Sequence, residues 1–326
     1  MSIASYARAS DTGKKRRRNE DSYVVAPPLF AVADGMGGAQ AGEVASRLAA
    51  SALEGDDSDA QEATKRIDEL IQEANRRIFD RATTDPSASG MGTTMTVALV
   101  EGMTVAIGHV GDSRAYLVRG EHMEQLTDDH SLVNELVKSG KLSEEEAQAH
   151  PQRSVITRAV GTDPDVDVDG FTIEAEEGDV FLICSDGLSD MVEDEEILEL
   201  VLANRDDLDK AVKALVSAAN RGGGEDNITA VAFRISSEAA PSLEDTVAMP
   251  ALTGDEEPDE QTREYPERDG HGDTMVVPPG ELGEAPIAAR APPPPAADAR
   301  RVRIVLIGIV VLLLVAAAIV WWLVVR

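Results

Sequence analysis

The sequence predicts an α+β fold built on antiparallel β-sheets, followed by two segments of different character. Three observations carry this prediction. Short apolar runs of strand length follow one another in hairpin-like succession, and the helical patterns do not alternate strictly with them, which disfavours a doubly wound parallel sheet. The composition then changes after residue 235 and again at residue 304, so we divide the chain into 1–235, 236–303 and 304–325.

The composition excludes several classes of protein. The chain has 326 residues, with 60 Asp and Glu against 30 Lys and Arg, a formal net charge of −30, 3% aromatic residues and one Cys. One Cys excludes a disulfide-built scaffold and a Cys-rich zinc module. The acidic balance argues against nucleic-acid binding, which needs a basic surface. Because there are only five His, a metal site here should consist mostly of carboxylates, which favour Mg2+ or Mn2+.

The folded part, residues 1–235, is expected to contain both strands and helices. Apolar runs predict strands at Tyr23–Val25, Leu29–Ala33, Thr94–Val100, Thr104–Val110, Ala115–Val118, Val180–Ser185 and Ile228–Phe233. Helical periodicity predicts helices at Ala41–Leu53, Ala60–Arg81, Leu132–Ser139, Ile197–Ala203 and Leu208–Asn220. Ser143 and Glu146 form a capping-box signature for one more short helix.

The segment 236–303 is rich in Pro, Ala, Asp and Glu and has little periodicity, so it is expected to be a disordered, self-repelling linker. It contains two similar hexapeptides, Asp245–Pro250 and Asp273–Pro278, each reading Asp-Thr, three apolar residues and Pro. One explanation is chance within a biased composition. The other is a pair of phosphorylation sites at Thr246 and Thr274 that dock a reader domain bearing Arg.

The segment 304–325 is an unbroken apolar run and predicts a C-terminal transmembrane helix. At 1.5 Å per residue it is about 33 Å long, against about 30 Å for a hydrocarbon core. Arg300, Arg301 and Arg303 precede it and only Arg326 follows, so the positive-inside rule places the N-terminal part in the cytoplasm, at the cell inner membrane. No N-terminal signal peptide is visible. The alternative is a buried core helix.

Four acidic residues are placed where predicted strands begin or end. Asp34, Asp112 and Asp186 each follow an apolar run, and Asp226 stands just before the last one. Any single Asp-Gly pair is most simply a strand-ending turn. Four carboxylates at the rim of one core, however, would repel one another unless a cation neutralised them. An adjacent Gly lets the backbone turn and brings a carbonyl oxygen near such an ion.

Charged residues near the N-terminus extend this pattern. Glu20 and Asp21 stand before a strand, and Lys14–Arg18 is a basic run ahead of them. The run is a solvated basic patch, a nucleic-acid contact or an anion pocket. An anion pocket is possible chemically because guanidinium groups recognise phosphate bidentately. Cys184 lies inside an apolar strand and is expected to be a buried structural thiol.

Taken in order, the motifs resemble those of bacterial metal-dependent protein phosphatase 2C-like serine/threonine phosphatases. The similar segments cover nearly all of residues 5–235. They are Ser10–Ser22, Ala33–Gly38, Gly42–Ser46, Gly92–Thr94, His109–Arg114, His150–Arg153, Cys184–Leu188 and Gly224–Thr229. The resemblance implies a four-layer α-β-β-α sandwich of two antiparallel sheets flanked by helices, with metal ions in a cleft at one end.

The resemblance also implies a role for each matching residue. Asp34 would bridge two Mn2+ or Mg2+ ions, Asp186 and Asp226 would complete the first, and the Gly35 carbonyl would bind the second. Glu20 and Asp21 would act largely through water. Asp112, with Asp186, would help hold a weaker third ion, and Arg16 would bind the substrate phosphate. A water activated by the ions would then attack phosphorus without a covalent enzyme intermediate.

One residue departs from the family pattern, because Met36 stands where some eukaryotic relatives have a His proposed as general acid. The implied function is hydrolysis of phosphoserine and phosphothreonine in phosphoproteins, reversing serine/threonine kinases, by a monomeric catalytic domain. A non-catalytic phosphoprotein-binding relative is disfavoured because Asp34, Asp186 and Asp226 are all present. A third possibility is that the linker makes the chain an interaction hub. Specificity is expected to depend on a flap-like region at 128–162.

Overall fold

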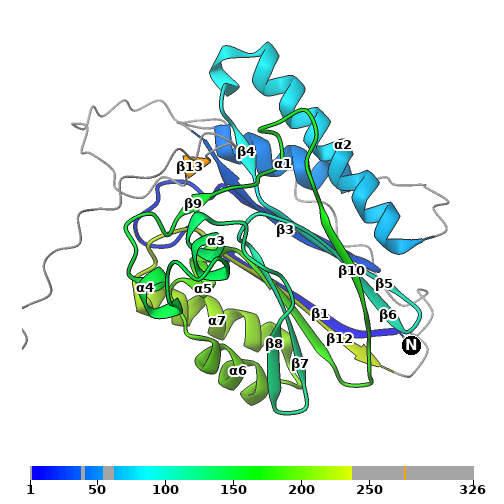
Figure 1. Cartoon of the computed structure of the whole chain (residues 1–326). Coiled ribbons are helices and arrows are strands. Elements are labelled where there is room, and N and C mark those ends of the chain that lie inside the picture. Colours follow the sequence, from blue (N-terminus) through cyan, green and yellow to red (C-terminus); the bar gives the residue numbers. More distant parts are fainter. Residues whose placement is uncertain (1, 38–40, 54–61, 237–274, 277–326) are drawn as a thin grey trace, which may run out of the picture. The chain divides into compact units, whose positions relative to one another are not determined.

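The computed structural model of the chain describes residues 2–37, 41–53, 62–236 and 275–276. Within them, two antiparallel sheets pack face to face and helices cover both outer faces, which confirms the expected α-β-β-α arrangement (Figure 1). The predicted transmembrane helix at 304–325 and the candidate phosphosites Thr246 and Thr274 lie outside the described residues. Within the described ranges, no helix has the length and apolar character needed to cross a membrane.

The first sheet has the strand order β1-β12-β11-β7-β8, and neighbouring strands are antiparallel. Its strands are β1 (Ser2–Asp11), β12 (Ile228–Ser236), β11 (Val180–Cys184), β7 (Arg114–Arg119) and β8 (His122–Gln125). The two ends of the folded domain therefore lie side by side, since β1 pairs with β12 over its whole length. This pairing brings the basic run after β1 next to the acidic loop before β12.

The second sheet has the strand order β10-β6-β5-β3-β2, with β4 paired to the end of β3. Its strands are β10 (Asp169–Glu174), β6 (Thr104–Val110), β5 (Met95–Glu101), β3 (Leu29–Met36), β2 (Asp21–Ala26) and β4 (Gly92–Thr93). The inner faces of the two sheets meet in an apolar layer. Phe233 stacks between Phe30 and Phe181 there, with ring centroids 4.3 and 5.1 Å away.

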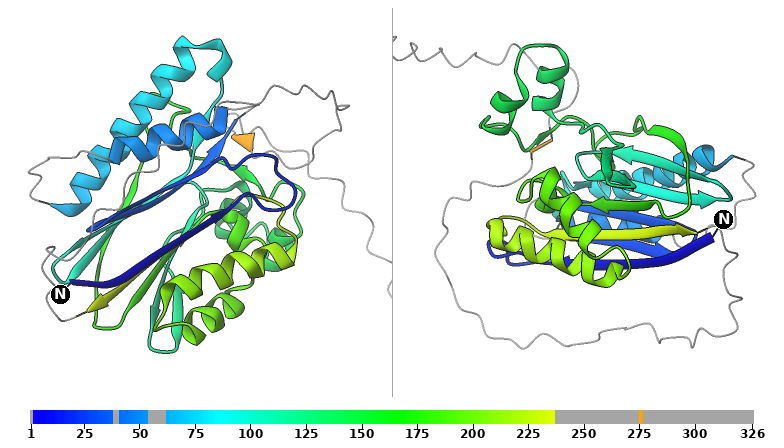
Figure 2. Two further views of the ribbon diagram at one scale, coloured as in Figure 1. Left: turned by 180° about the vertical axis from the view of Figure 1, so that it is seen from behind. Right: turned by 90° about the horizontal axis from the view of Figure 1, so that it is seen from below.

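Helices pack on the outer face of each sheet. On the second sheet, α1 (Ala41–Leu53) contacts β3, and α2 (Ala63–Thr84) contacts β6 and ends before the turn η1 (Pro86–Ala88). On the first sheet, α7 (Leu208–Gly222) contacts β1 and β12, while α6 (Asp194–Ala203) packs on α7. A separate apolar cluster lies under each helical layer, and Figure 2 shows both layers on opposite sides.

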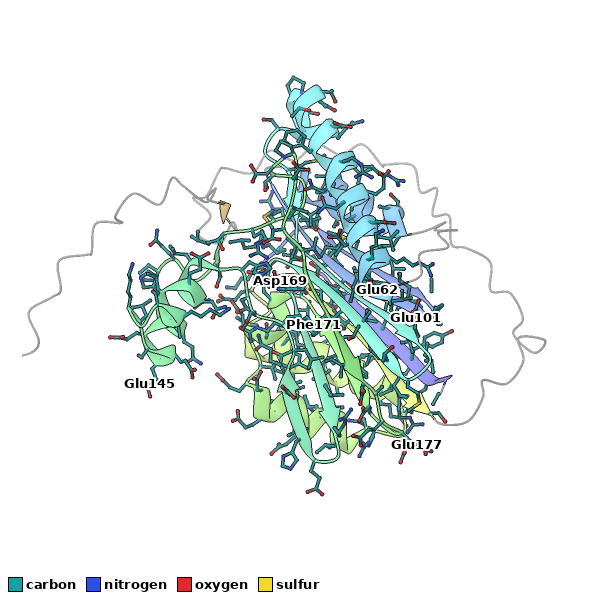
Figure 3. The ribbon with its side chains drawn as sticks, turned by 45° about the vertical axis from the view of Figure 1, so that its right-hand side comes forward. Glu62, Glu101, Glu145, Asp169, Phe171 and Glu177 are labelled. Carbon is teal, nitrogen blue, oxygen red and sulfur yellow. The ribbon has the colours of Figure 1, made fainter. Side chains whose placement is uncertain are left out.

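A third group of elements projects from the sandwich over one end of the sheets. It consists of α3 (Leu132–Lys138), α4 (Glu144–Gln148) and β9 (Val155–Ile156), within the predicted flap-like region. The predicted capping box of Ser143 and Glu146 starts α4. Figure 3 shows Glu145 of α4 far from Asp169 and Phe171 of β10. A last strand, β13 (Met275–Val276), pairs with β9, although the sequence predicted no regular structure in 236–303.

The apolar pattern located the central strands and one edge strand, β2. It missed the edge strands β1, β8 and β10 and the two-residue strands β4 and β9. In β1, of the residues whose burial is described, only Ala7 is buried, and β10 alternates between half-buried and exposed residues. Edge strands owe their place to backbone pairing with one neighbour, so they need no apolar run. Asp34 also differs from its predicted place, because β3 continues through it to Met36 instead of ending at Ala33.

Candidate metal and phosphate site

The predicted acidic residues come together at one end of the sandwich, with contributions from both sheets. Asp21 begins β2 and is the register partner of Asp34 on β3. Asp186 begins the short helix α5 (Asp186–Ser189) directly after β11. Asp226 lies in the loop before β12, and Asp112 lies between β6 and β7. Asp21 and Asp34 belong to the second sheet, whereas Asp186 and Asp226 lie next to strands of the first sheet. Both sheets therefore supply carboxyl groups to the same site.

The glycines beside these acids allow backbones to approach closely. A Cβ on Gly35 would overlap the Gly42 carbonyl of α1, and a Cβ on Gly187 would overlap the Asn227 carbonyl. Neither Gly35 nor Gly187 has a positive φ. The expectation that each Gly serves a sharp turn is therefore wrong for these two, and the reason is packing between neighbouring segments. Gly111, before Asp112, does have the positive φ of 111° that a turn glycine shows.

Asp34 is held by threonine side chains of the neighbouring strands. Its backbone N–H donates to Thr94 Oγ1 at 2.9 Å, and its carbonyl accepts from Thr93 Oγ1 at 2.7 Å. Thr94 Oγ1 in turn lies 2.7 Å from Ser113 Oγ, beside Asp112. These hydroxyls are buried, so the backbone around Asp34 is tied to the loop that carries Asp112.

Ser185 links two other acidic segments. Its hydroxyl donates to Asp21 Oδ2 at 2.9 Å and accepts from the Thr229 N–H at 3.0 Å. The other oxygen, Asp21 Oδ1, is buried and has no hydrogen-bond partner among the residues that the structure describes, and the same is true of Asp186 Oδ1. Buried carboxylate oxygens without a donor are rare in folded proteins because desolvation without compensation is unfavourable.

The pKa values of the clustered carboxyl groups are raised for the same reason. Burial raises the pKa of Asp21 to about 6 and that of Asp112 to about 7. Burial also raises the pKa of Asp34 well above its usual range, and the charges of Asp21 and Asp186 raise it further. The pKa of Asp186 is raised by burial and then by Asp112. Carboxyl groups that raise one another's pKa in this way are those that a cation would stabilise.

Arg16 lies in the loop after β1 and reaches the cluster. Its Nη2 donates to Asp226 Oδ2 at 2.8 Å, and both side chains are 25% exposed. The predicted phosphate-binding residue and a predicted metal ligand are thus direct partners in this structure. The other basic residues of the run, Lys14, Lys15, Arg17 and Arg18, are exposed.

Asn227 fixes the Arg16 loop, and sequence reasoning gave it no role. Its Oδ1 accepts from the Glu20 N–H at 2.8 Å, and its Nδ2 donates to the carbonyls of Thr12 and Arg18 at 3.0 and 2.9 Å. The residue is 3% exposed. It therefore closes both ends of the Thr12–Arg18 loop onto β12. The only signal in the sequence was its place directly after Asp226.

These residues fit a divalent ion in their chemistry. In the parts of the chain that the structure describes, no three Asp, Glu, His or Cys side chains already converge as a ready set of ligands. Asp21 and Asp186 each have a buried oxygen without a hydrogen-bond partner among the described residues, and the pKa of each is raised. A bound cation would stabilise these carboxylates. Carboxylate oxygens are the ligands that Mg2+ and Mn2+ prefer.

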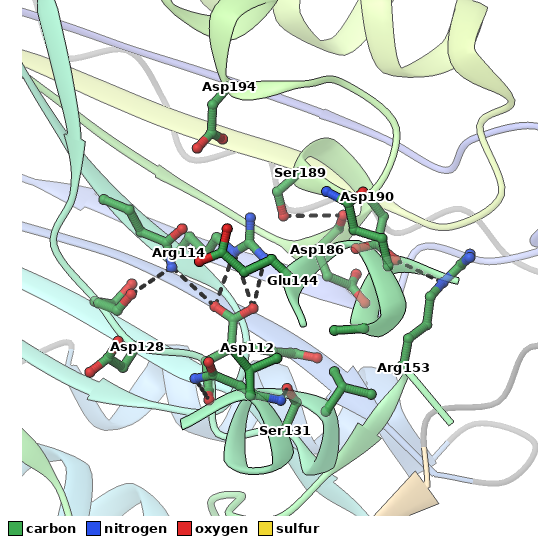
Figure 4. Close-up of a pocket in the computed structure, with 18 of the residues that line it drawn as sticks. Asp112, Arg114, Asp128, Ser131, Glu144, Arg153, Asp186, Ser189, Asp190 and Asp194 are labelled. Carbon is green, nitrogen blue, oxygen red and sulfur yellow. Dashed lines mark hydrogen bonds and ion pairs between the residues drawn. The ribbon is translucent and has the colours of Figure 1, made fainter. Parts of the chain in front are cut away.

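A cavity of about 840 Å3 opens beside Asp112 and Asp186, between the flap and α5 (Figure 4). Acidic residues predominate in its wall, which also includes Arg114 and Arg153. Figure 4 shows Ser189 Oγ donating to the Asp186 carbonyl and Arg153 facing Asp190. Asp190, whose pKa is raised by burial, is a further acidic group at the site that the sequence did not single out.

The remaining candidates take structural places. His109 is fully buried, between Thr96 Oγ1 at 2.9 Å and the Asp128 carbonyl at 3.1 Å, so it belongs to the core. Cys184 is also fully buried, and burial raises the pKa of its thiol to about 12, which confirms a structural thiol. Met36 is buried against Ile156 and Ala159. Glu20 contributes its carbonyl, which accepts from the Gly35 N–H at 3.2 Å.

Comparison with known proteins agrees with this site. Residues 14–228 match the protein phosphatase 2C family. The chain is 42% identical over 231 residues to the serine/threonine protein phosphatase PstP of Mycobacterium tuberculosis, covering 70% of this chain and 44% of that protein. It is 40% identical over 235 residues to the serine/threonine phosphatase stp of Listeria innocua, covering 68% and 91%. The chain thus spans less than half of PstP and most of stp.

A solved structure shows the same fold with metal bound. The catalytic domain of PstP in complex with two manganese ions superposes with a TM-score of 0.66 at 39% identity, covering 71% of this chain and 98% of that one. The fold and the carboxylate site are those of the α-β-β-α class to which this metal-bound structure belongs. The chain belongs to the protein phosphatase 2C family. The expected use of Mn2+ or Mg2+ is thereby confirmed at the level of the family.

Proposed function

We propose that the chain hydrolyses phosphoserine and phosphothreonine in proteins. The observation that carries this proposal is the convergence of Asp21, Asp34, Asp112 and Asp186 at one end of the sandwich, with Arg16 beside them. The names of the relatives PstP and stp support the same activity. Membership of the family makes this cluster the place where the substrate phosphate is expected to bind.

The proposal assigns metal binding, phosphate binding and positioning to different residues of the site. Asp34, Asp186 and Asp226 would hold the metal ions, with Asp21, Glu20 and the Gly35 carbonyl in support and Asp112 at a weaker position. Divalent ions bound there lower the pKa of water and offset the charge of the phosphate. The Arg16 guanidinium supplies a two-pronged donor to phosphate oxygens. Thr94, Ser185 and Asn227 hold these groups in place through the hydrogen bonds described above.

The nucleophile in this proposal comes from solvent, not from a side chain. Cys184 is buried with a raised pKa and is therefore protonated at neutral pH. His109 is enclosed in the core, and burial lowers its pKa to about 3, so it is a neutral imidazole near neutral pH and does not serve as an imidazolium acid. Direct attack on phosphorus in line with the leaving oxygen then needs only orientation and charge stabilisation.

Its cellular setting is a further part of the proposal. The apolar run 304–325 would anchor the chain in the cell inner membrane with the catalytic domain in the cytoplasm, and the acidic linker 236–303 would tether it. Serine/threonine kinases and their targets in the same membrane would be its substrates. Tethering raises the effective concentration of such partners without any new contact.

The catalytic proposal is tested by assaying the full chain on a phosphothreonine peptide with and without Mn2+. The Asp34→Asn variant is expected to lose activity by at least about a thousandfold, and a matched change remote from the site, Asp207→Asn at the start of α7, is expected to have no effect. Activity independent of Mn2+, or full activity of the Asp34 variant, would show that this site does not perform the reaction.

The membrane proposal needs a separate experiment. Full-length chain and a chain ending at residue 303 are expressed, and membranes are washed with carbonate. The full chain is expected to stay in the membrane fraction and the shortened chain to leave it. Recovery of the full chain in the wash contradicts anchoring and leaves the catalytic proposal intact.

A further inference from the structure

A short strand from beyond the phosphatase domain pairs with the flap. β13, Met275–Val276, runs parallel to β9 with Met275 opposite Val155 and Val276 opposite Ile156 (Figure 1). The family match ends at residue 228 and β12 ends at Ser236, so β13 belongs to the linker. It is the central part of the hexapeptide Asp273–Pro278, the second of the two similar motifs in that linker.

β9 has two backbone edges, and the domain itself uses one. Ile156 forms an antiparallel bridge with Ser131 at the start of α3, and the Thr157 N–H donates to the His130 carbonyl at 2.8 Å. The opposite edge faces β13. A strand edge with open donors and acceptors is a template for a further strand, and peptides commonly bind in this way.

β9 is also joined to the candidate active site on both sides. Ile156, 1% exposed, packs against Met36, which follows Asp34 by two residues on β3. Arg153 and Ser154, directly before β9, line the acidic cavity, and Arg153 lies 3.8 Å from Asp190. A strand that orders β9 therefore orders one wall of the cavity.

We propose that β9 is a docking edge for an extended segment, and that its occupant is the Met275–Val276 segment of the same chain. The part of the chain after β12 would then contact the flap at Met275–Val276. The proposal is independent of the catalytic activity and of the membrane anchor. It is carried by the strand register and by the contact of β9 with β3 through Ile156 and Met36.

The energetics suit a reversible contact. Two residues offer only a few backbone hydrogen bonds, each with a small net effect in water. Covalent connection compensates, because a segment of the same chain binds at an effective concentration on the order of millimolar. The first hexapeptide, Asp245–Pro250, has the same pattern and provides a matched control, with Val247 and Ala248 in the places of Met275 and Val276.

Hydrogen exchange of the full chain in Mn2+ tests the docking. The double variant Met275→Pro with Val276→Pro removes two backbone donors and disfavours the pairing. It is expected to accelerate exchange of residues 153–158 by roughly threefold or more, while Val247→Pro with Ala248→Pro leaves exchange there unchanged. Equal exchange in all three proteins overturns the proposal, and so does equal acceleration by both variants.

Disulfide trapping tests the register and the source of the strand. Cys184, the single native cysteine, is fully buried, so an introduced pair can be followed without interference. The pair Val155→Cys with Met275→Cys is expected to form an intramolecular disulfide faster than Val155→Cys with Val247→Cys. Equal rates for both pairs, or a disulfide found mainly between two chains, shows that Met275–Val276 of the same chain is not the occupant.

Discussion

Arg16 Nη2 and Asp226 Oδ2 form a 2.8 Å ion pair that joins the loop after β1 to the loop before β12. The pair places a guanidinium beside a carboxylate that the family pattern assigns to a metal ion. Metal binding at Asp226 would free the Arg16 fork for phosphate. The same contact thus orients Arg16 in advance.

Replacement of Arg16 by Ala is therefore expected to lower kcat/KM for a phosphothreonine peptide by about a hundredfold at saturating Mn2+, because a bidentate donor to the phosphate is lost. Mn2+ affinity, measured by calorimetry, should not fall, since Asp226 loses a competing partner. Arg16→Lys keeps the charge without the fork and should give an intermediate value. A kcat/KM within twofold of the parent for Arg16→Ala contradicts a phosphate-binding role.

Asn227 is expected to be a positioning residue for the Arg16 loop. Asn227→Ala removes three hydrogen bonds and leaves the Glu20 N–H without its acceptor, so the free energy of unfolding should fall by about 2 kcal/mol. Activity should fall mainly through a higher KM. Asn204→Ala, at the end of α6, removes one hydrogen bond remote from the site and should leave KM unchanged. Equal KM values in the two variants would refute the assignment.

Gly35 is expected to be required for packing. Gly35→Ala would press a Cβ into the carbonyl of Gly42, which is backbone and cannot move away cheaply. The free energy of unfolding, measured by denaturant titration, should fall by about 2 to 3 kcal/mol. Gly170→Ala is the matched control, because Gly170 also lies in a strand, β10, and a Cβ there meets no atom within 4 Å. Similar losses in both variants would mean that close packing is not the reason for Gly35.

His109 is expected to make stability depend on pH. Burial lowers its pKa from 6.5 to about 3, so between these values the unfolded chain binds a proton that the folded chain does not. Stability therefore falls as pH falls below about 6.5, with a slope from this group of about 1.4 kcal/mol per pH unit. His109→Gln should reduce the slope between pH 4 and 5.5 by about that amount, whereas the exposed His122→Gln should not. An unchanged slope in His109→Gln would refute the prediction.

The exposed basic residues Arg17 and Arg18 are expected to attract acidic phosphosubstrates. Replacing both by Ala should weaken the dependence of kcat/KM on ionic strength, because long-range attraction between exposed charges is screened by salt. The measurement is kcat/KM for an acidic phosphopeptide across a salt series. A salt dependence equal to that of the parent shows that these two charges do not contribute.

Sequence pattern located the interior of the fold more accurately than its edges. β6 was predicted with its observed bounds and α1 likewise, since both have many apolar residues that only burial explains. β1, β8 and β10 were missed because the strength of an edge strand lies in its backbone ladder with a partner far along the chain. Asp34 was expected after a strand, but pairing with β2 and β4 carries β3 past it to Met36.

The sequence alone determined the chemistry of the site: a set of carboxylates, one Arg-bearing loop, and too few His or Cys for another kind of metal centre. Residue type and strand-end placement are local properties, so they can be read without coordinates. The tertiary structure decided which groups meet. The pairing of β1 with β12, Asn227 closing the Arg16 loop, Gly35 under Gly42, and β13 against β9 all join segments distant in sequence. Such contacts depend on the packing of the whole chain, and no local pattern specifies them.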